Sequence, residues 1–257
     1  MINNINQKVD RVYVVSVKSY SERINHIKNE MNRHRIDFHF VFNNDADELS
    51  EDITCKFDKN LSLPQISLIM KNIEVWNDAI MNNFQNILVF EDDAILTKNF
   101  VTDLVSIIND VKKIKPGYLV FLGGADTKVP FNKIKTNKNI FKHPIATAEG
   151  YLTDLLACKK RVDYIQSMKK KIRLPNDHLI KHLDKKLNII NFWSRKPLVE
   201  QGSVTGIFKT SLDRNRGKHS LLYNKIRYKW MKLKRRKLPD FFVKIFLKLK
   251  LLNANKD

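Results

Sequence analysis

The pattern that most constrains the fold is an alternation of strand-like and helix-like segments in the N-terminal third of the chain. Residues 12–17 (VYVVSV) are β-branched and apolar, as expected for a buried strand, and residues 38–42 (FHFVF) alternate like a second strand. Residues 19–35 and 63–81 place apolar side chains at helical spacing, and residues 87–90 (ILVF) form another short apolar run. Such alternation usually builds a sheet covered by helices, so the sequence predicts an α/β fold.

Three consecutive acids, Glu91, Asp92 and Asp93, directly follow the last of these apolar runs. In an open α/β sheet, ligands bind beyond the carboxyl ends of the strands, which is where these acids would lie. Three neighbouring carboxylates repel one another, and a bound cation or raised pKa values relieve the repulsion. Hard divalent cations such as Mg²⁺ or Mn²⁺ prefer carboxylate oxygens and can bridge to the phosphates of a nucleotide. The acid run therefore predicts a binding site for a metal-bound diphosphate.

The same three acids have a structural explanation that is about as good on these residues alone. A short acidic run after a strand is often a solvated turn or the charged start of a helix. Residues 94–96 (AIL) follow the acids, however, and a purely solvated turn rarely separates two core-like segments. The apolar residues on both sides therefore favour the metal site.

Length and charge limit the remaining function classes. The 257 residues suffice for one α/β domain with an extension, and a hydrophobic share of 43% argues against wholesale disorder. A formal net charge of +20 points to nucleic acid, an anionic membrane surface or a phosphorylated substrate as partner. The two cysteines, Cys55 and Cys158, lie far apart and outside any metal-ligand spacing, so a reduced, cytoplasmic setting is expected. No segment reaches the roughly 20 apolar residues that span a bilayer, so we expect any membrane contact to be peripheral.

Seven motifs follow one another in a fixed order between about residues 10 and 210. They are VYVVSVKSYSER (12–23), LSLPQISLIMKNIEVWNDAI (61–80), VFEDDAIL (89–96), YLVFLG (118–123), AEGYLTD (148–154), PNDH (175–178) and PLVEQGSVTGIF (197–208). This ordered series resembles the bacterial lipopolysaccharide glycosyltransferases of glycosyltransferase family 25. Relatives of that family include β-galactosyltransferases of lipooligosaccharide synthesis and, more distantly, the collagen galactosyltransferases.

The resemblance implies a GT-A-like fold, in which a Rossmann-type nucleotide-binding half joins an acceptor-binding half. It also implies an inverting transfer of a sugar from a nucleotide sugar, with UDP-galactose or a close relative as the donor. The acceptor would be a lipopolysaccharide or another surface glycan. By this similarity Asp93, with Asp92 or Glu91, belongs to the metal-binding acid motif, and Mn²⁺ or Mg²⁺ is the cofactor.

The acceptor hydroxyl of such a reaction needs a general base, which is normally an Asp or a Glu. Asp177 is our candidate, because the matching family segment carries an acid there and Pro175 suggests the mouth of a loop. His178 is assigned to the metal site, with phosphate binding as the alternative. A plain surface pair of Asp177 and His178 explains the same two residues equally well.

Three further residues are assigned to the donor site. Arg23 is expected to reach the nucleotide, Tyr151 to stack on a sugar or base, and Gly123, beside Gly124, to allow close backbone approach to the ligand. Each also has a simpler explanation: Arg23 as a surface charge, Tyr151 as an aromatic of the core, and Gly123 as part of a turn.

The helix before the acid run departs from the family pattern. The family usually shows a Gly-Glu-Ile-Gly-Cys start and a Ser-His pair, whereas this chain has PQISL (64–68, beginning with Pro64 and Gln65) and then Lys71 and Asn72. Sugar specificity is therefore open, and an inactive relative is an alternative. Lys71 could meet a phosphate and Asn72 could keep a hydrogen-bonding role, but solvated positions on an amphipathic helix explain both more simply.

The C-terminal part of the chain carries most of the charge. Residues 214–257 contain 15 Lys or Arg against two acids. Within them, residues 241–252 (FFVKIFLKLKLL) predict an interfacial helix, with apolar residues on one face and lysines beside it. The face consists of Phe242, Ile245, Phe246 and Leu249, and the lysines are Lys244 and Lys248. We therefore divide the chain into a glycosyltransferase domain (residues 1–212) and a basic amphipathic helical extension (213–257) that binds an anionic membrane surface on the cytoplasmic side, where a lipid-linked acceptor would also lie.

Three rival functions remain as alternatives. A nucleic-acid-binding protein would explain the net charge, but the basic residues gather in the extension and no binding motif is recognisable. A metal-dependent nucleotidyltransferase or phosphotransferase would also use clustered acids, but the sequence contains no P-loop. The third is a non-catalytic family relative that acts as a membrane-associated scaffold. The sequence favours a metal-dependent inverting glycosyltransferase that is peripheral to the inner face of the cytoplasmic membrane.

Overall fold

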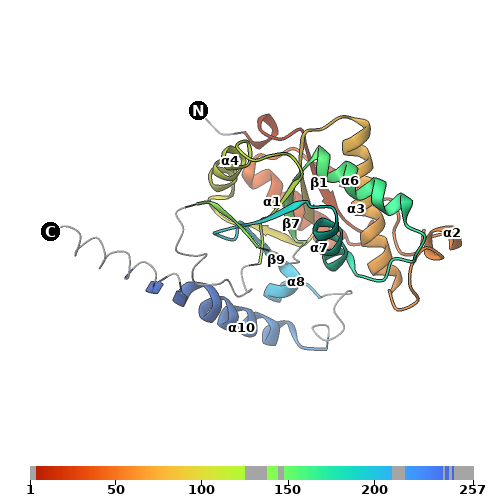
Figure 1. Ribbon diagram of the computed structural model, residues 1–257. Coiled ribbons are helices and arrows are strands. Elements are labelled where there is room, and N and C mark those ends of the chain that lie inside the picture. The colour runs from red at the N-terminus through yellow and green to blue at the C-terminus, as the bar shows by residue number, and fades with distance from the viewer. Residues whose placement is uncertain are drawn as a thin grey trace.

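A computed structural model describes residues 4–124, 138–143, 148–209, 218–239, 241–242 and 245. In these ranges a seven-stranded mixed sheet forms the centre of the protein, and helices cover both of its faces (Figure 1). In spatial order its strands are β2 (His39–Val41), β1 (Arg11–Val15), β3 (Asn86–Glu91), β7 (Gly150–Asp154), β5 (Tyr118–Phe121), β8 (Ile190–Ser194) and β6 (Ile140–Lys142). A separate two-stranded sheet joins β4 (Ala94–Leu96) to β9 (Val199–Gln201) in antiparallel register.

Strand direction decides where a ligand can bind. Strand β1 runs parallel to β2 and β3, and β5 runs parallel to β8. Strand β7 lies between β3 and β5 and runs against both of them, so these two strands point the same way. The carboxyl ends of β1, β2, β3, β5 and β8 therefore meet at one edge of the sheet, which we call the carboxyl edge.

The helices divide between the two faces of the sheet. One face is covered by α1 (Ser21–His34) and α4 (Phe100–Val111), and the other by α3 (Leu63–Met81), α6 (Leu155–Ser167) and α7 (Asn176–Lys186). The shorter or peripheral elements are η1 (Ile5–Gln7), α2 (Glu51–Thr54), α8 (Gly202–Thr205), α10 (Leu221–Lys232) and η2 (Leu233–Lys237). This arrangement confirms the predicted α/β class.

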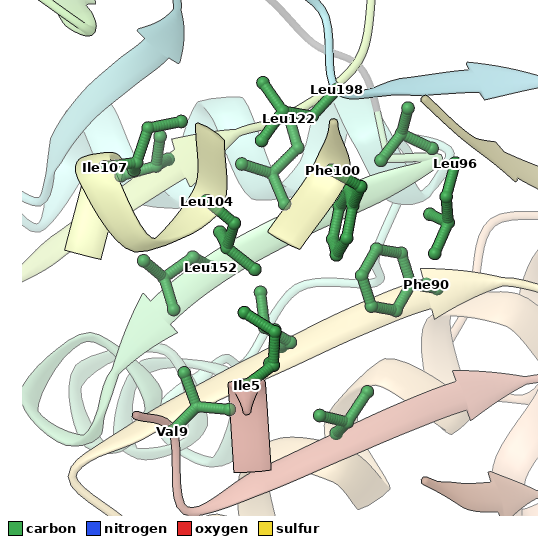
Figure 2. Packing of buried hydrophobic residues seen from close by; sticks show 14 of the residues in the cluster. Ile5, Val9, Phe90, Leu96, Phe100, Leu104, Ile107, Leu122, Leu152 and Leu198 are labelled. Atoms are coloured by element: carbon green, nitrogen blue, oxygen red, sulfur yellow. The ribbon is translucent and has the colours of Figure 1, made fainter. Parts of the chain in front are cut away.

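Side chains that alternate along the strands fill two cores. On the face covered by α4, Phe90 of β3 and Leu152 of β7 pack with Phe100 and Leu104 of the helix, and Figure 2 shows this cluster from close by. The neighbouring strand residue Val89 points the other way and belongs to the core beneath α3 and α6. This period of two is what an internal strand covered on both faces requires.

The sequence-derived elements are confirmed with small shifts at their ends. The strands predicted at 12–17, 38–42 and 87–90 are β1, β2 and β3, and the helices predicted at 19–35 and 63–81 are α1 and α3.

The start of α3 explains two departures from the family pattern. Pro64 occupies the first turn, and the Gln65 side chain accepts a hydrogen bond from the Ser62 N–H at 3.0 Å. A proline in the first turn and a glutamine three residues after the N-cap both stabilise a helix start.

The basic extension is described in part. The proposed boundary between residues 212 and 213 lies outside the described residues, as does most of the helix predicted at 241–252. The part that is described forms α10 and η2, and α10 packs against α8 (Figure 1). Within the described ranges, no helix combines the length and the apolar character needed to cross a membrane.

Candidate active site at the carboxyl edge

The acid run lies at the carboxyl edge, where β3 ends. Glu91 is the last residue of β3, and Asp92 and Asp93 form the turn into β4. A fourth carboxylate, Glu149, lies beside them, because β7 runs against β3 and so begins next to the end of β3. The Glu91 N–H donates to the Glu149 carbonyl oxygen at 3.3 Å. Glu149 was not among the predicted site residues, because the antiparallel position of β7 could not be read from a single sequence.

Asp92 is held by groups that follow strand β1. The Ser16 hydroxyl donates to Asp92 Oδ2 at 2.8 Å, and Arg23 Nη1 donates to Asp92 Oδ1 at 3.0 Å. A second guanidinium nitrogen of Arg23 donates to the Lys209 carbonyl oxygen at 2.5 Å. Arg23, predicted to reach the donor site, is therefore brought to the acid run and joins it to the segment after α8.

Asp93 is almost fully buried, with 1% of its surface exposed. The Ser203 N–H donates to Asp93 Oδ2 at 2.9 Å, and the Gly202 N–H donates to the Asp93 carbonyl oxygen at 2.7 Å. Asp93 Oδ1 has no hydrogen-bond partner within the part of the chain that the structure describes. A buried carboxylate oxygen without a partner is costly, so this oxygen points to a missing ligand.

Burial and mutual repulsion disfavour the ionised forms of Glu91 and Asp92. Burial raises the pKa of Glu91 well above its usual range, and the carboxylates of Asp93 and Glu149 raise it further, although a hydrogen bond from Gln201 Nε2 at 2.8 Å opposes the rise. Burial also raises the pKa of Asp92, and Arg23 acts against that rise. The cluster therefore carries an electrostatic strain that a cation would relieve.

Gly123 has a different role from the predicted one. A Cβ on Gly123 would lie 2.0 Å from Glu149 Oε1, so the space beside this glycine holds the Glu149 side chain. The Gly124 N–H donates to the same oxygen at 2.5 Å. The prediction that Gly123 lets a ligand approach the backbone is therefore wrong on this side, because a carboxylate of the protein occupies the space.

Tyr151 lies in the core, not in the donor site. Its side chain is buried beneath α3, where the hydroxyl donates to Asn72 Oδ1 at 2.6 Å and accepts from Trp76 Nε1 at 3.2 Å. The prediction that Tyr151 stacks on a sugar or base is therefore wrong, and the simpler explanation of a core aromatic is correct.

Lys71 and Asn72, the two polar residues of α3 that depart from the family pattern, also have structural roles. Lys71 is buried, and its ammonium group donates to Asp45 Oδ1 at 2.8 Å and to the carbonyl oxygens of Phe42 and Asn43 at 2.9 and 2.8 Å. Asn72 is buried beside Tyr151. Neither residue is a solvated surface position, and Lys71 is already occupied by the loop that follows β2.

Asp177 and His178 lie in the first turn of α7. Because α7 leads by a short turn into β8 and packs against it, the helix begins at the carboxyl edge, the same edge as the acid run. The His178 side chain is exposed, and the Asp177 carboxylate accepts a hydrogen bond from the His178 N–H at 2.8 Å. Asp177 thus lies at the same edge as the acid run without bonding to it, and its role as the general base stays a prediction.

The carboxylates fit a divalent cation in part. Among the described residues, no three Asp, Glu, His or Cys side chains converge on a point that could hold a metal ion. Glu91, Asp93 and His178 are therefore not brought together in the part of the chain that the structure describes, and their joint role in metal binding stays a prediction. Nucleotide-bound Mg²⁺ commonly needs only one or two carboxylates, because phosphates and water complete its shell. The unpartnered Asp93 oxygen fits a cation of that kind.

The family model described as "Glycosyltransferase family 25 (LPS biosynthesis protein)" matches residues 9–180, which is well over half of the chain and includes the acid run, Glu149 and Asp177. No curated protein matches the chain significantly. Among solved structures, the chain is similar to the galactosyltransferase LgtC in complex with donor and acceptor sugar analogs, at 8% identity and a TM-score of 0.40, over 88% of this chain and 96% of that chain.

Proposed function

The chain belongs to glycosyltransferase family 25, and from that premise we propose that it transfers galactose from UDP-galactose to a lipopolysaccharide or related surface glycan. The family membership supports a sugar donor and a glycan acceptor. The choice of galactose, the UDP carrier and the use of Mn²⁺ or Mg²⁺ are the specific parts of the proposal.

One observation carries the proposal. The buried Asp93 carboxylate keeps one oxygen without a partner among the described residues, and it does so at the edge where open α/β sheets bind ligands. The carboxylates of Glu91, Asp92 and Glu149 lie in the same cluster. Their negative charge raises the electrostatic cost of leaving the Asp93 oxygen without a cation. When bound, the cation supplies Lewis-acid stabilisation of the negative charge on the departing diphosphate.

Arg23 supplies a fixed positive charge at the same place. Burial alone would lower the pKa of Arg23, but the carboxylates of Asp93 and Asp92 raise it, so the guanidinium group stays protonated. A guanidinium group has five N–H donors, and two nitrogens of Arg23 already bind Asp92 and the Lys209 carbonyl oxygen. We propose that Arg23 holds Asp92 in place and neutralises the charge of a donor phosphate.

The reaction is a displacement at the anomeric carbon of the donor sugar. The acceptor hydroxyl oxygen forms a bond to this carbon while the bond between the carbon and the phosphate oxygen breaks. The nucleoside diphosphate leaves with the bonding electron pair, and the hydroxyl proton passes to the Asp177 carboxylate. Since attack and departure take place on opposite faces of the sugar, the configuration inverts.

The test is turnover of a panel of UDP-, GDP- and CMP-sugars, with Mn²⁺ and with chelator, in the presence of a lipopolysaccharide acceptor extract. We expect turnover of UDP-galactose that depends on the metal and falls by at least about 100-fold in Asp93→Asn. The exposed residue Asp163, on α6, provides the matched control, and Asp163→Asn should retain full activity.

Two outcomes of this test would overturn the proposal. If the folded protein turns over no donor and binds none, the chain is a non-catalytic relative. If turnover persists in chelator and in Asp93→Asn, the acid run does not hold a metal-bound diphosphate. Circular dichroism of both variants separates either outcome from a loss of folding.

A further inference from the structure

Helix α10 has two chemically different faces. Asn224 and Tyr228, one turn apart, are buried against the rest of the protein. Leu222, Ile226 and Trp230 follow one another at the same spacing, and 67%, 61% and 61% of their surfaces are exposed. Residues four apart on a helix lie on one face, so these three residues form a continuous apolar stripe, which we call the outer stripe.

Positive charge surrounds the outer stripe. Between residues 221 and 239 the sequence has eight Lys or Arg and no Asp or Glu. Lys225, Arg227 and Lys229 lie in the same helix turns as the stripe, and all three are exposed. An exposed apolar stripe flanked by cations is the pattern of a helix that lies flat in the interface of an anionic bilayer.

We propose that the outer stripe of α10 docks on an anionic phospholipid surface. The apolar residues would enter the boundary between headgroups and acyl chains, and the flanking cations would meet lipid phosphates. A second copy of this chain is a poor occupant, since Lys225, Arg227 and Lys229 of one copy would face the same cations of the other. Nucleic acid would match the charge but would leave Leu222 and Ile226 in water. The inner leaflet of the cytoplasmic membrane supplies such lipids.

The docking helix abuts the candidate active site. Helix α8 lies between α10 and Asp93, and its Ser203 N–H donates to the Asp93 carboxylate. A Cβ on Gly206, which follows α8, would lie 2.4 Å from the Leu221 carbonyl oxygen, so the start of α10 is in close backbone contact with this segment. Near its other end, Lys232 pairs with Glu200 of β9. Under the proposed function, docking would hold the acid run close to a lipid-linked acceptor.

Tryptophan fluorescence gives a direct test, because the three tryptophans differ in exposure. Trp76 and Trp193 are buried, and Trp230 lies in the outer stripe. We expect vesicles of phosphatidylglycerol and phosphatidylcholine to shift the emission of the full chain to the blue and to co-sediment with it, whereas phosphatidylcholine alone does neither. Trp230→Phe should keep the co-sedimentation, because the ring stays apolar, and should lose the fluorescence shift.

A paired variant tests the stripe itself. In Leu222→Gln/Ile226→Gln we expect vesicle affinity to fall by roughly tenfold or more, because two apolar side chains no longer enter the interface. Met81→Gln, which changes an exposed apolar residue on α3, is the matched control and should bind like the wild type. Both changes are at exposed positions, and circular dichroism confirms folding.

The proposal is overturned if the wild type does not bind anionic vesicles, or if the paired variant binds them as well as the wild type does. It is also overturned if size-exclusion chromatography shows a dimer that the paired variant abolishes, since the stripe is then a contact between copies. Binding of an oligonucleotide without binding of vesicles overturns it as well. None of these measurements uses a sugar donor, so a failure of docking is distinguishable from a failure of the proposed glycosyl transfer.

Discussion

The carboxylate of Glu149 fills the volume in which a side chain on Gly123 would begin, with 2.0 Å between Glu149 Oε1 and the position of that Cβ. Gly123→Ala should therefore displace Glu149 and break its hydrogen bond from the Gly124 N–H. We expect a loss of about 1–3 kcal/mol in the free energy of unfolding, together with lower transferase activity. Urea denaturation and donor turnover measure the two effects.

A double-mutant cycle provides the control for Gly123. Glu149→Ala removes the carboxylate that the new methyl group would strike, so Gly123→Ala should cost much less stability in that background. If the loss of stability in the double variant equals the sum of the losses in the two single variants, the two residues do not compete for this volume.

The ion pair between Arg161 and Asp184 should be among the most sensitive points of the fold. Both side chains are fully buried, with nitrogen–oxygen distances of 2.7 and 2.9 Å, and Arg161 also donates to Thr153 Oγ1 at 3.1 Å. Arg161→Gln leaves a buried carboxylate without its cation, so we expect a loss of about 3–5 kcal/mol in the free energy of unfolding.

A surface ion pair gives the matched comparison for Arg161. Arg173 lies 3.4 Å from an Asp58 carboxylate oxygen, and 76% of its side chain is exposed. Arg173→Gln should cost less than about 1 kcal/mol, because water screens the pair. Equal losses in the two variants in chemical denaturation would contradict this ranking.

The core position of Tyr151 predicts an effect on stability. Tyr151→Phe keeps the ring but removes the hydroxyl that joins Asn72 to Trp76. Two buried polar groups lose a partner, so the free energy of unfolding should fall by about 1–3 kcal/mol, as measured by thermal or chemical denaturation. An unchanged stability would mean that the hydroxyl is not part of the core network.

The two cysteines should differ sharply in reactivity. Burial raises the pKa of the Cys158 thiol to about 12, and the thiol lies in the core beneath α6, whereas Cys55 is exposed. The thiolate is the reactive form, so Cys158 should resist maleimide in the folded protein from about pH 7 to about pH 10, while Cys55 reacts. Mass spectrometry should find one label on the native protein and two in urea, and Cys55→Ser should leave the native protein unlabelled.

Local signals in the sequence sufficed for β1, α1, β2, α3 and β3. Helix α3 begins and ends at the predicted residues, because Pro64, the Ser62–Gln65 cap and the apolar stripe act within the helix itself. The acid run was placed at the carboxyl edge because it directly follows an apolar strand. Both inferences depend only on neighbouring residues.

Residues that act through distant contacts were interpreted less well. Lys71 looks like a solvated position on an amphipathic helix, yet its partners come from the loop after β2. Glu149 joins the acid run only because β7 enters the sheet between β3 and β5 in the opposite direction. Neither relationship leaves a periodic trace in the sequence, so a single chain without its fold could not supply them.

The position of β7 also bears on how the chain reaches its native state during synthesis. This strand, Gly150–Asp154, is translated after β5 but lies between β5 and β3. Until it emerges, a nascent chain carries two strand edges that can pair with the wrong partner, and long-range pairing of this kind slows folding. The connection between β3 and β5 must therefore wait for a later segment, and β8 is translated later still, so open strand edges persist during synthesis and prolong the risk of aggregation.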